Sequence, residues 1–221
     1  MKYGESVFDV LYLILTVTVG VIILIKARNG NEKLMGAAAV ILGCGDAFHL
    51  VPRVLNYFTD ADFTAALGAG KLITSVTMTL FYILVYHIGR SYFGLGKNRT
   101  LTAAVYALSA LRIALCLFPQ NRWLRNESGM TWGIIRNVPF AALGVIVIIL
   151  YFRNRKTAKR FAPMWILMLL SFAFYIPVAV FAGVVPMLGM LMLPKTVCYV
   201  LIVLIFAAAV TKDAPMPEEV V

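Results

Sequence analysis

The chain has 221 residues, of which 62% are hydrophobic and 14% are charged, and its mean hydropathy is +0.88. Soluble domains contain about 45–50% apolar and about 25% charged residues, so this composition predicts an integral membrane protein. The formal net charge of +10 comes mainly from short segments between apolar stretches. Such charge is typical of membrane topology signals, and we expect a lipid bilayer and no nucleic acid as partner.

Seven stretches are apolar and about 20 residues long, which is the length that a helix needs to cross a bilayer. In chain order they are Val7–Ile25, Leu34–Phe58, Ala65–Ile88, Leu101–Phe118, Trp132–Phe152, Phe161–Val185 and Leu188–Val210. None shows the alternating pattern of a barrel strand. The sequence therefore predicts an all-α membrane protein, with residues 1–221 forming a single polytopic domain of seven transmembrane helices.

The connecting segments differ in charge between the two sides of the predicted membrane. Lysine and arginine dominate the segments after the first, third and fifth spans. The segment after the second span carries Asp60 and Asp62, and the one after the fourth carries Arg122, Arg125 and Glu127. Basic loops stay on the cytoplasmic side. We therefore expect the N-terminus outside and the tail, residues 211–221, in the cytoplasm, in the plasma or inner membrane of the cell.

Two parts of the chain resemble each other. When the chain is aligned with itself at one constant shift, Arg28-Asn29 pairs with Arg153-Asn154, Pro52 with Pro177 and Asp46 with Ser171. Lys71 pairs with Lys195 if one residue is deleted from the alignment. Residues 7–88 and 132–210 thus form two three-helix repeats, and the span at residues 101–118 is an unpaired linker. Four spans separate equivalent helices, so the repeats run parallel, in a 3+1+3 arrangement.

This 3+1+3 arrangement with an external N-terminus resembles the SWEET sugar transporters and the wider PQ-loop group, which includes the KDEL receptor. The chain lacks the group's Pro-Gln signature in its first and fifth spans. Where SWEET proteins have an asparagine on the third helix of each triplet, it has Gly70-Lys71 and Pro194-Lys195. The resemblance implies a central site between the two triplets.

Basic residues lie in the outer third of five different spans. They are Arg53, Lys71, Arg112, Arg136 and Lys195. A rise of 1.5 Å per helical residue places them roughly 6–11 Å below the outer surface. Long basic side chains can extend to the headgroups, which we expect to suit Arg53 and Arg136 better than the deeper Lys71 and Arg112.

If these cations converge, their natural ligand is an anion. Arginine binds carboxylate or phosphate through two parallel hydrogen bonds, and lysine acts as a point charge. Tyr175 and Tyr199 would add hydroxyl donors to the same site. We therefore expect a small anionic solute or a lipid headgroup as the ligand.

An acid and an imidazole lie deeper, in the second span. Asp46 is too short to reach the headgroups, so we expect it to face the bundle interior and to find a partner in Lys71, Arg112 or His49. His49 follows Asp46 by three residues and shares its helix face. It is interpreted either as an interhelical hydrogen-bonding residue or as a proton-responsive group paired with Asp46.

No known catalytic motif occurs, and two histidines are too few for the zinc site of seven-helix amide hydrolases. We expect no catalytic residue, metal or cofactor, and the sequence does not indicate an oligomeric state. The leading hypothesis is a carrier-like protein that binds an anion in a central cationic cavity open to the outside. The alternatives are a ligand-binding sensor or receptor, and a membrane-embedded lipid-modifying enzyme that uses Asp46 and His49.

Overall fold

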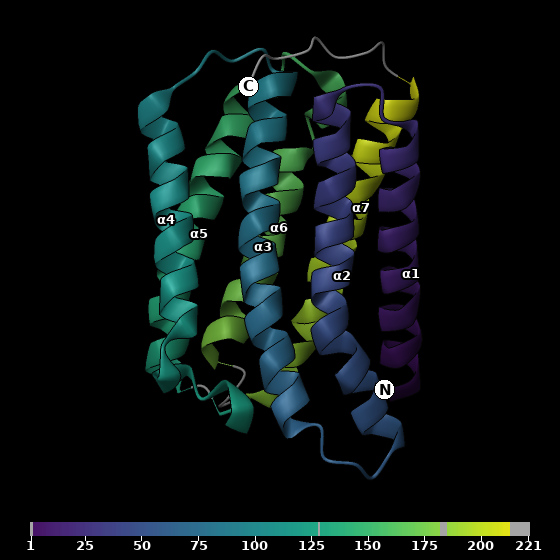
Figure 1. The fold of residues 1–221 in the computed structure, drawn as a ribbon, viewed down its shortest axis with the longest axis vertical. Coiled ribbons are helices and arrows are strands. Elements are labelled where there is room, and N and C mark those ends of the chain that lie inside the picture. The colour runs from purple at the N-terminus through teal and green to yellow at the C-terminus, as the bar shows by residue number, and fades with distance from the viewer. Residues whose placement is uncertain (1, 128, 182–184, 213–221) are drawn as a thin grey trace.

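The computed structural model describes residues 2–127, 129–181 and 185–212, which contain helices and no strands (Figure 1). The long helices are α1 (Lys2–Lys26), α2 (Gly30–Phe58), α3 (Thr64–Tyr92), α4 (Arg99–Leu117), α5 (Met130–Arg153), α6 (Met164–Phe181) and α7 (Met192–Lys212). Short helices are η1 (Pro119–Asn121), η2 (Trp123–Arg125), η3 (Lys159–Phe161) and η4 (Pro186–Leu191). Seven helical segments are long and apolar enough to cross a membrane, which confirms the prediction of an all-α, multi-pass membrane protein.

Predicted and observed boundaries differ most around the sixth and seventh spans. The sixth helix begins at Met164, after Pro163, and the seventh begins at Met192, after the short helix that Pro186 starts. Proline lacks the backbone donor of a helix interior, which favours a helix boundary near it. Residues 182–184 of the predicted sixth span, and residues 213–221 of the predicted tail, lie outside the described residues.

The helices run up and down the bundle in chain order, and each packs against the next (Figure 1). The first helix also packs against the last, and α3 packs against α5 as well as α4. In Figure 1, α4 and α5 lie at one side of the bundle, and α1 and α7 lie at the other. We call the lower end in this view, where α1 begins, the N-terminal end. The upper end, with the loops after α1, α3 and α5, is the basic end.

Short polar side chains mark where several helices begin. Asn29 accepts a hydrogen bond from the backbone of Glu32 at 2.9 Å, and Asn98 accepts one from Leu101 at 3.0 Å. These are N-caps, which satisfy backbone donors that have no partner within the helix. At the start of α3, the exposed Asp62 accepts from the backbone of Thr64 at 2.8 Å. Hydrogen bonds from the Thr64 side chain and backbone hold the pKa of Asp62 below its usual value.

The apolar core occupies the middle of the bundle and the half next to the basic end. Aromatic side chains of four helices meet there, and Tyr82 contacts Phe140 and Phe172 at centroid distances of 5.2 and 5.4 Å. Such pairs add attraction beyond the area they bury. The half next to the N-terminal end instead holds the charged residues discussed below. The helix α2 bends in this half (Figure 1), where it contains Pro52.

Candidate functional site

The predicted site residues all lie on helices in the half of the bundle next to the N-terminal end or at its middle. They are Asp46, His49 and Arg53 on α2, Lys71 on α3, Arg112 on α4, Arg136 on α5, Tyr175 on α6, and Lys195 and Tyr199 on α7. The structure divides them between the two sides of the bundle, and Lys71, His49 and Lys195 lie between these sides.

Asp46 lies at the contact between α1 and α2. The hydroxyl of Tyr12 on α1 donates a hydrogen bond of 2.7 Å to its Oδ2. The expected partners, Lys71, Arg112 and His49, make no hydrogen bond or ion pair with Asp46 in the described part of the chain, so that expectation was wrong. The positive charge that acts on Asp46 is Lys195, on α7. Sequence reasoning missed Tyr12 because the partner was sought among charged residues.

A second carboxylate lies beside this pair. Asp9 on α1 has 4% of its surface exposed, and its Oδ2 has no hydrogen-bond partner within the described chain. The charge of Asp46 acts on Asp9. Asp9 and Tyr12 are three residues apart and share the buried face of their helix. We call Asp9, Tyr12 and Asp46 the carboxylate site.

Arg112 lies on the opposite side of the bundle and is 1% exposed. Its Nη1 donates to the backbone oxygen of Arg136 at 3.0 Å and to Oδ1 of Asn137 at 2.8 Å. Its guanidinium carbon lies 3.9 Å from the ring centroid of Phe140. Arg112 therefore does not extend to the headgroups, as expected, and neutral groups hold its charge. Its Nε has no hydrogen-bond partner within the described residues.

Arg136 is next to Arg112 and faces the loop between α4 and α5. Its Nη1 donates to Oδ1 of Asn121 at 2.8 Å, and its guanidinium carbon lies 4.4 Å from the Trp123 ring centroid. The amide of Asn121 in turn donates to the last carbonyls of α4, including Leu115 at 2.8 Å. We call Arg112, Arg136, Asn121 and Asn137 the arginine site. The hydroxyl of Tyr175 joins it by donating to Oδ1 of Asn137 at 2.7 Å.

Lys71 is exposed, and its Nζ donates to Oδ1 of Asn126 in the same loop at 2.7 Å. Its amine therefore reaches the loop at the N-terminal end, although outward extension was expected to suit Lys71 less well than Arg53 and Arg136. The loop lies close to α3 because Gly68 has no side chain; a Cβ there would overlap the carbonyl of Trp123.

Arg53 has an acidic partner that the sequence did not suggest. It forms an ion pair with Glu5 of α1, and the hydroxyl of Tyr57 donates to Glu5 at 3.1 Å. The charges of Arg53 and Arg136 both act on Lys71. We call Arg53, Lys71 and Arg136 the basic cluster; its members come from three helices.

His49 and Asp46 point to different neighbours. The Nδ1 of His49 lies 3.4 Å from the carbonyl oxygen of Leu67 on α3, whereas Asp46 accepts from Tyr12 on α1. The helices α2 and α3 can approach closely here because Gly70 has no side chain. A Cβ on Gly70 would overlap the carbonyl of Phe48. His49 thus has the interhelical role of its first interpretation, and no acid–base pair with Asp46 is formed.

Lys195 lies between the two sides. Its Nζ is 4.9 Å from the ring centroid of Tyr175 and 5.5 Å from that of Tyr199. Aromatic faces attract cations, so both rings stabilise the ammonium group. Tyr199 also lies within 3.4 Å of the hydroxyls of Tyr82 and Ser171. Lys195 is therefore held by aromatic rings while its charge acts on Asp46.

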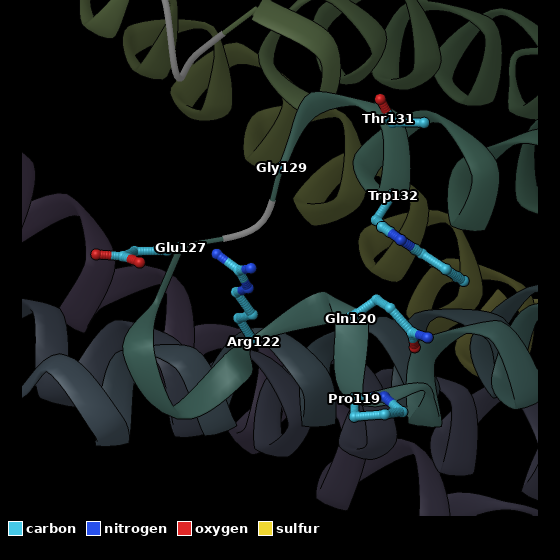
Figure 2. A pocket seen from close by; sticks show the side chains of 7 residues that line it. All are labelled: Pro119, Gln120, Arg122, Glu127, Gly129, Thr131 and Trp132. Carbon is cyan, nitrogen blue, oxygen red and sulfur yellow. The ribbon is translucent and has the colours of Figure 1, made fainter.

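Two pockets lie near these residues. The larger, of about 570 Å³, lies against the loop between α4 and α5 and is lined by Pro119, Gln120, Arg122, Glu127, Gly129, Thr131 and Trp132. Figure 2 shows Arg122 and Glu127 along one edge of this pocket and Gln120 and Trp132 along another. The smaller, of about 140 Å³, lies between α5 and α6 and reaches Asn137 and Tyr175. Neither is lined by Asp46 or Lys71, so the predicted central cavity is neither of these pockets and stays a prediction.

Comparison with protein-family models, curated proteins and solved structures found no match for this chain. The described residues contain no group of three or more His, Cys, Asp and Glu side chains that could hold a metal ion. The fold and composition define the class, a multi-pass membrane protein with seven candidate membrane-spanning helices. The site can chemically offer cations and hydroxyl donors on one side and carboxylates on the other.

Proposed function

We propose that the protein is a carrier-like membrane protein that binds a small anionic solute or a lipid headgroup through its basic cluster. The observation that supports this is the position of Lys71. Lys71 is an exposed residue, its amine donates to the neutral Asn126, and two arginine charges repel it. Gathering like charges costs free energy that a bound anion recovers.

The residues around Lys71 suggest how an anion would be held. Lys71 supplies a point charge at the N-terminal end, and Arg136 offers a guanidinium that can bind a carboxylate or phosphate with two hydrogen bonds. Arg112 lies behind Arg136 and repels it. An anion that replaced Asn126 on Lys71 would thus meet a second and a third positive charge as it moved inward.

The same proposal gives the remaining predicted residues roles in binding the anion or controlling its passage. Tyr175, Lys195 and Tyr199 adjoin one another and would bind the anion from α6 and α7. Asp46 and His49 would lie deeper in the bundle than the bound anion and act as a gate to its further movement. Arg53 would join the ligand set on release from Glu5.

We propose an orientation of the protein from the charge of its loops. Because basic loops stay in the cytoplasm, we place the basic end in the cytoplasm and the basic cluster on the outer side of a plasma or inner membrane. The parallel 3+1+3 repeat belongs to the same proposal and would make Lys71 and Lys195 equivalent residues of the two triplets.

A sensor is the nearest alternative, because the same cluster would serve a receptor that binds an anion without moving it. The enzyme hypothesis has less support, since Asp46 and His49 hydrogen-bond to different helices.

Uptake and binding of labelled anions by the purified protein in proteoliposomes test the proposal, with a dicarboxylate, a sugar phosphate and a phospholipid headgroup as probes. In Lys71→Gln we expect binding to weaken about tenfold or more, because a charge-assisted hydrogen bond contributes about 1.5–3 kcal/mol. The matched control is Lys97→Gln, an exposed lysine in the loop after α3. Equal binding by both variants would contradict the proposal. Binding without uptake would identify a sensor instead.

A further inference from the structure

Asp9 has an unusual environment for a carboxylate in a membrane-spanning helix. It lies seven residues into α1, which is about 10 Å from the start of the helix. With 4% of its surface exposed, it has no hydrogen bond or ion pair within the described chain. An ionised carboxylate is costly in such a place unless something compensates its charge.

The groups that face Asp9 do not supply that compensation. On its own helix, Tyr12 donates its hydroxyl to Asp46 rather than to Asp9. From α2, the negative charge of the Asp46 carboxylate repels that of Asp9. From α7, Lys195 and Tyr199 are the groups whose charges interact with Asp46. Two carboxylates thus share one nearby cation, which leaves one negative charge in excess.

A buried hydroxyl one turn further along the same face indicates that the site is polar. Thr16 is fully buried, and its hydroxyl interacts with the Tyr12 side chain. It shares the buried face of α1 with Asp9 and Tyr12. A metal ion fits this environment less well, because the described residues contain no group of three carboxylate, thiolate or imidazole ligands.

We propose that the carboxylate site binds a proton, carried by Asp9 and exchanged with solvent at the N-terminal end. Protonation removes the excess negative charge and turns a carboxylate with no partner into a neutral group with an O–H to donate. Asp46 differs from Asp9 because it accepts the Tyr12 hydroxyl and has the charge of Lys195 nearby, and both of these favour its ionised form.

This site also gives the proposed carrier a coupling ion, an extension that rests on the proposed function. Lys195 favours the ionised form of Asp46. An anion bound to Lys195 would offset its positive charge, so the two carboxylates together would then hold more protons. Anion binding is therefore expected to take up a proton from solvent, which is the linkage that a proton–anion symporter requires.

The proton site is tested first without any anion, by infrared titration of the purified protein. A protonated carboxyl group absorbs infrared light at a different frequency from a carboxylate. We expect a band from a protonated carboxyl group at neutral pH, and we expect this band to be lost in Asp9→Asn. The control is Asp62→Asn, which removes an exposed carboxylate at the same end and leaves the band in place. Because asparagine matches aspartate in size, thermal unfolding should show that both variants are folded. A band that survives in Asp9→Asn, or no band at neutral pH, would overturn the proton site.

Coupling is tested with the same proteins in weak buffer with a pH-indicator dye. Addition of an anion that binds should raise the pH of the wild-type sample and leave that of Asp9→Asn unchanged. Anion binding with no proton uptake in the wild type would overturn the coupling. If no anion binds, the proposed function fails, while the infrared band alone still decides the proton site.

Discussion

The carboxylate site and the arginine site occupy opposite sides of the same half of the bundle. They stabilise ionisable groups inside the bundle in different ways. In the carboxylate site, Asp46 accepts the Tyr12 hydroxyl and has the charge of one lysine nearby, whereas Oδ2 of Asp9 has no hydrogen-bond partner within the described chain. In the arginine site, Arg112 is buried, has no carboxylate partner among the described residues, and is held by oxygens of Arg136 and Asn137 and by the ring of Phe140. Positive and negative charges are thus kept apart rather than joined in a buried ion pair.

This separation indicates function more than stability. Intramembrane ionisable residues are expensive and mark binding or transport sites when they persist. A buried ion pair would neutralise both partners and leave neither for a ligand. Under the two proposals above, the separated arrangement would keep cations available to an anion on one side and a carboxylate available to a proton on the other. Lys71 and Lys195 lie between these two sites.

The largest expected effect comes from truncating the arginine site. Arg112→Ala should lower the free energy of unfolding by about 2–5 kcal/mol, the usual cost of removing a large buried side chain, because it leaves a cavity beside Phe140. Arg99→Ala, at the exposed start of the same helix, should change it by less than about 0.5 kcal/mol. Thermal unfolding of both variants in detergent measures the difference. Equal stabilities would show that Arg112 is not part of the packed structure.

A smaller loss is expected where the loop of the arginine site meets α3. A methyl group in Gly68→Ala would overlap the carbonyl of Trp123, and relieving such overpacking typically costs about 1–3 kcal/mol. The shifted loop should also weaken the contacts of Asn126 with Lys71 and of Asn121 with Arg136. Gly96→Ala has open space around its Cβ and serves as the control. Thermal unfolding and anion binding are the measurements, and no change in either would contradict this role of the loop.

On the carboxylate side, Tyr12→Phe removes the hydrogen bond to Asp46 without changing the shape of the side chain. Interhelical hydrogen bonds in membranes contribute about 0.6 kcal/mol on average and up to about 1.7 kcal/mol, and a loss in this range is expected. Tyr3→Phe, at an exposed tyrosine of the same helix, should have no effect on unfolding. A further expectation is that Tyr12→Phe alters the infrared titration of the carboxyl band, because Asp46 loses its donor. An unaltered titration would show that Asp46 does not influence the proton site.

The smallest effect on stability is expected for Glu5→Gln, which breaks the ion pair with Arg53. Ion pairs of this kind contribute about 0–1 kcal/mol. Anion affinity should nevertheless rise severalfold, because Arg53 then adds its charge to the basic cluster. Glu127→Gln makes the same charge change at the same end of the bundle and should raise affinity less. Binding titrations at two salt concentrations measure both, and equal gains would show that overall charge, rather than Arg53, attracts the anion.

Much of the fold was predictable from the sequence. The stretch Leu101–Phe118 corresponds to α4 (Arg99–Leu117), and Trp132–Phe152 corresponds to α5 (Met130–Arg153). Boundaries near Pro163 and Pro186 were placed less well, because apolar residues continue across those prolines. The predicted site residues share one half of the bundle or its middle, but their contacts were not predictable from the sequence. Lys71 and Arg112 have similar predicted depths, yet the first is exposed and the second is buried.

The sequence by itself determined the number, the length and the polarity of the helices, because a bilayer imposes these requirements on each span separately. Only the tertiary structure decided which charges meet. That choice depends on the rotation of each helix about its axis and on the path of the loop after α4, which brings Asn121, Trp123 and Asn126 to the basic residues. For the same reason, Asp46 has Tyr12 as its partner, and Asp9 has no partner among the described residues.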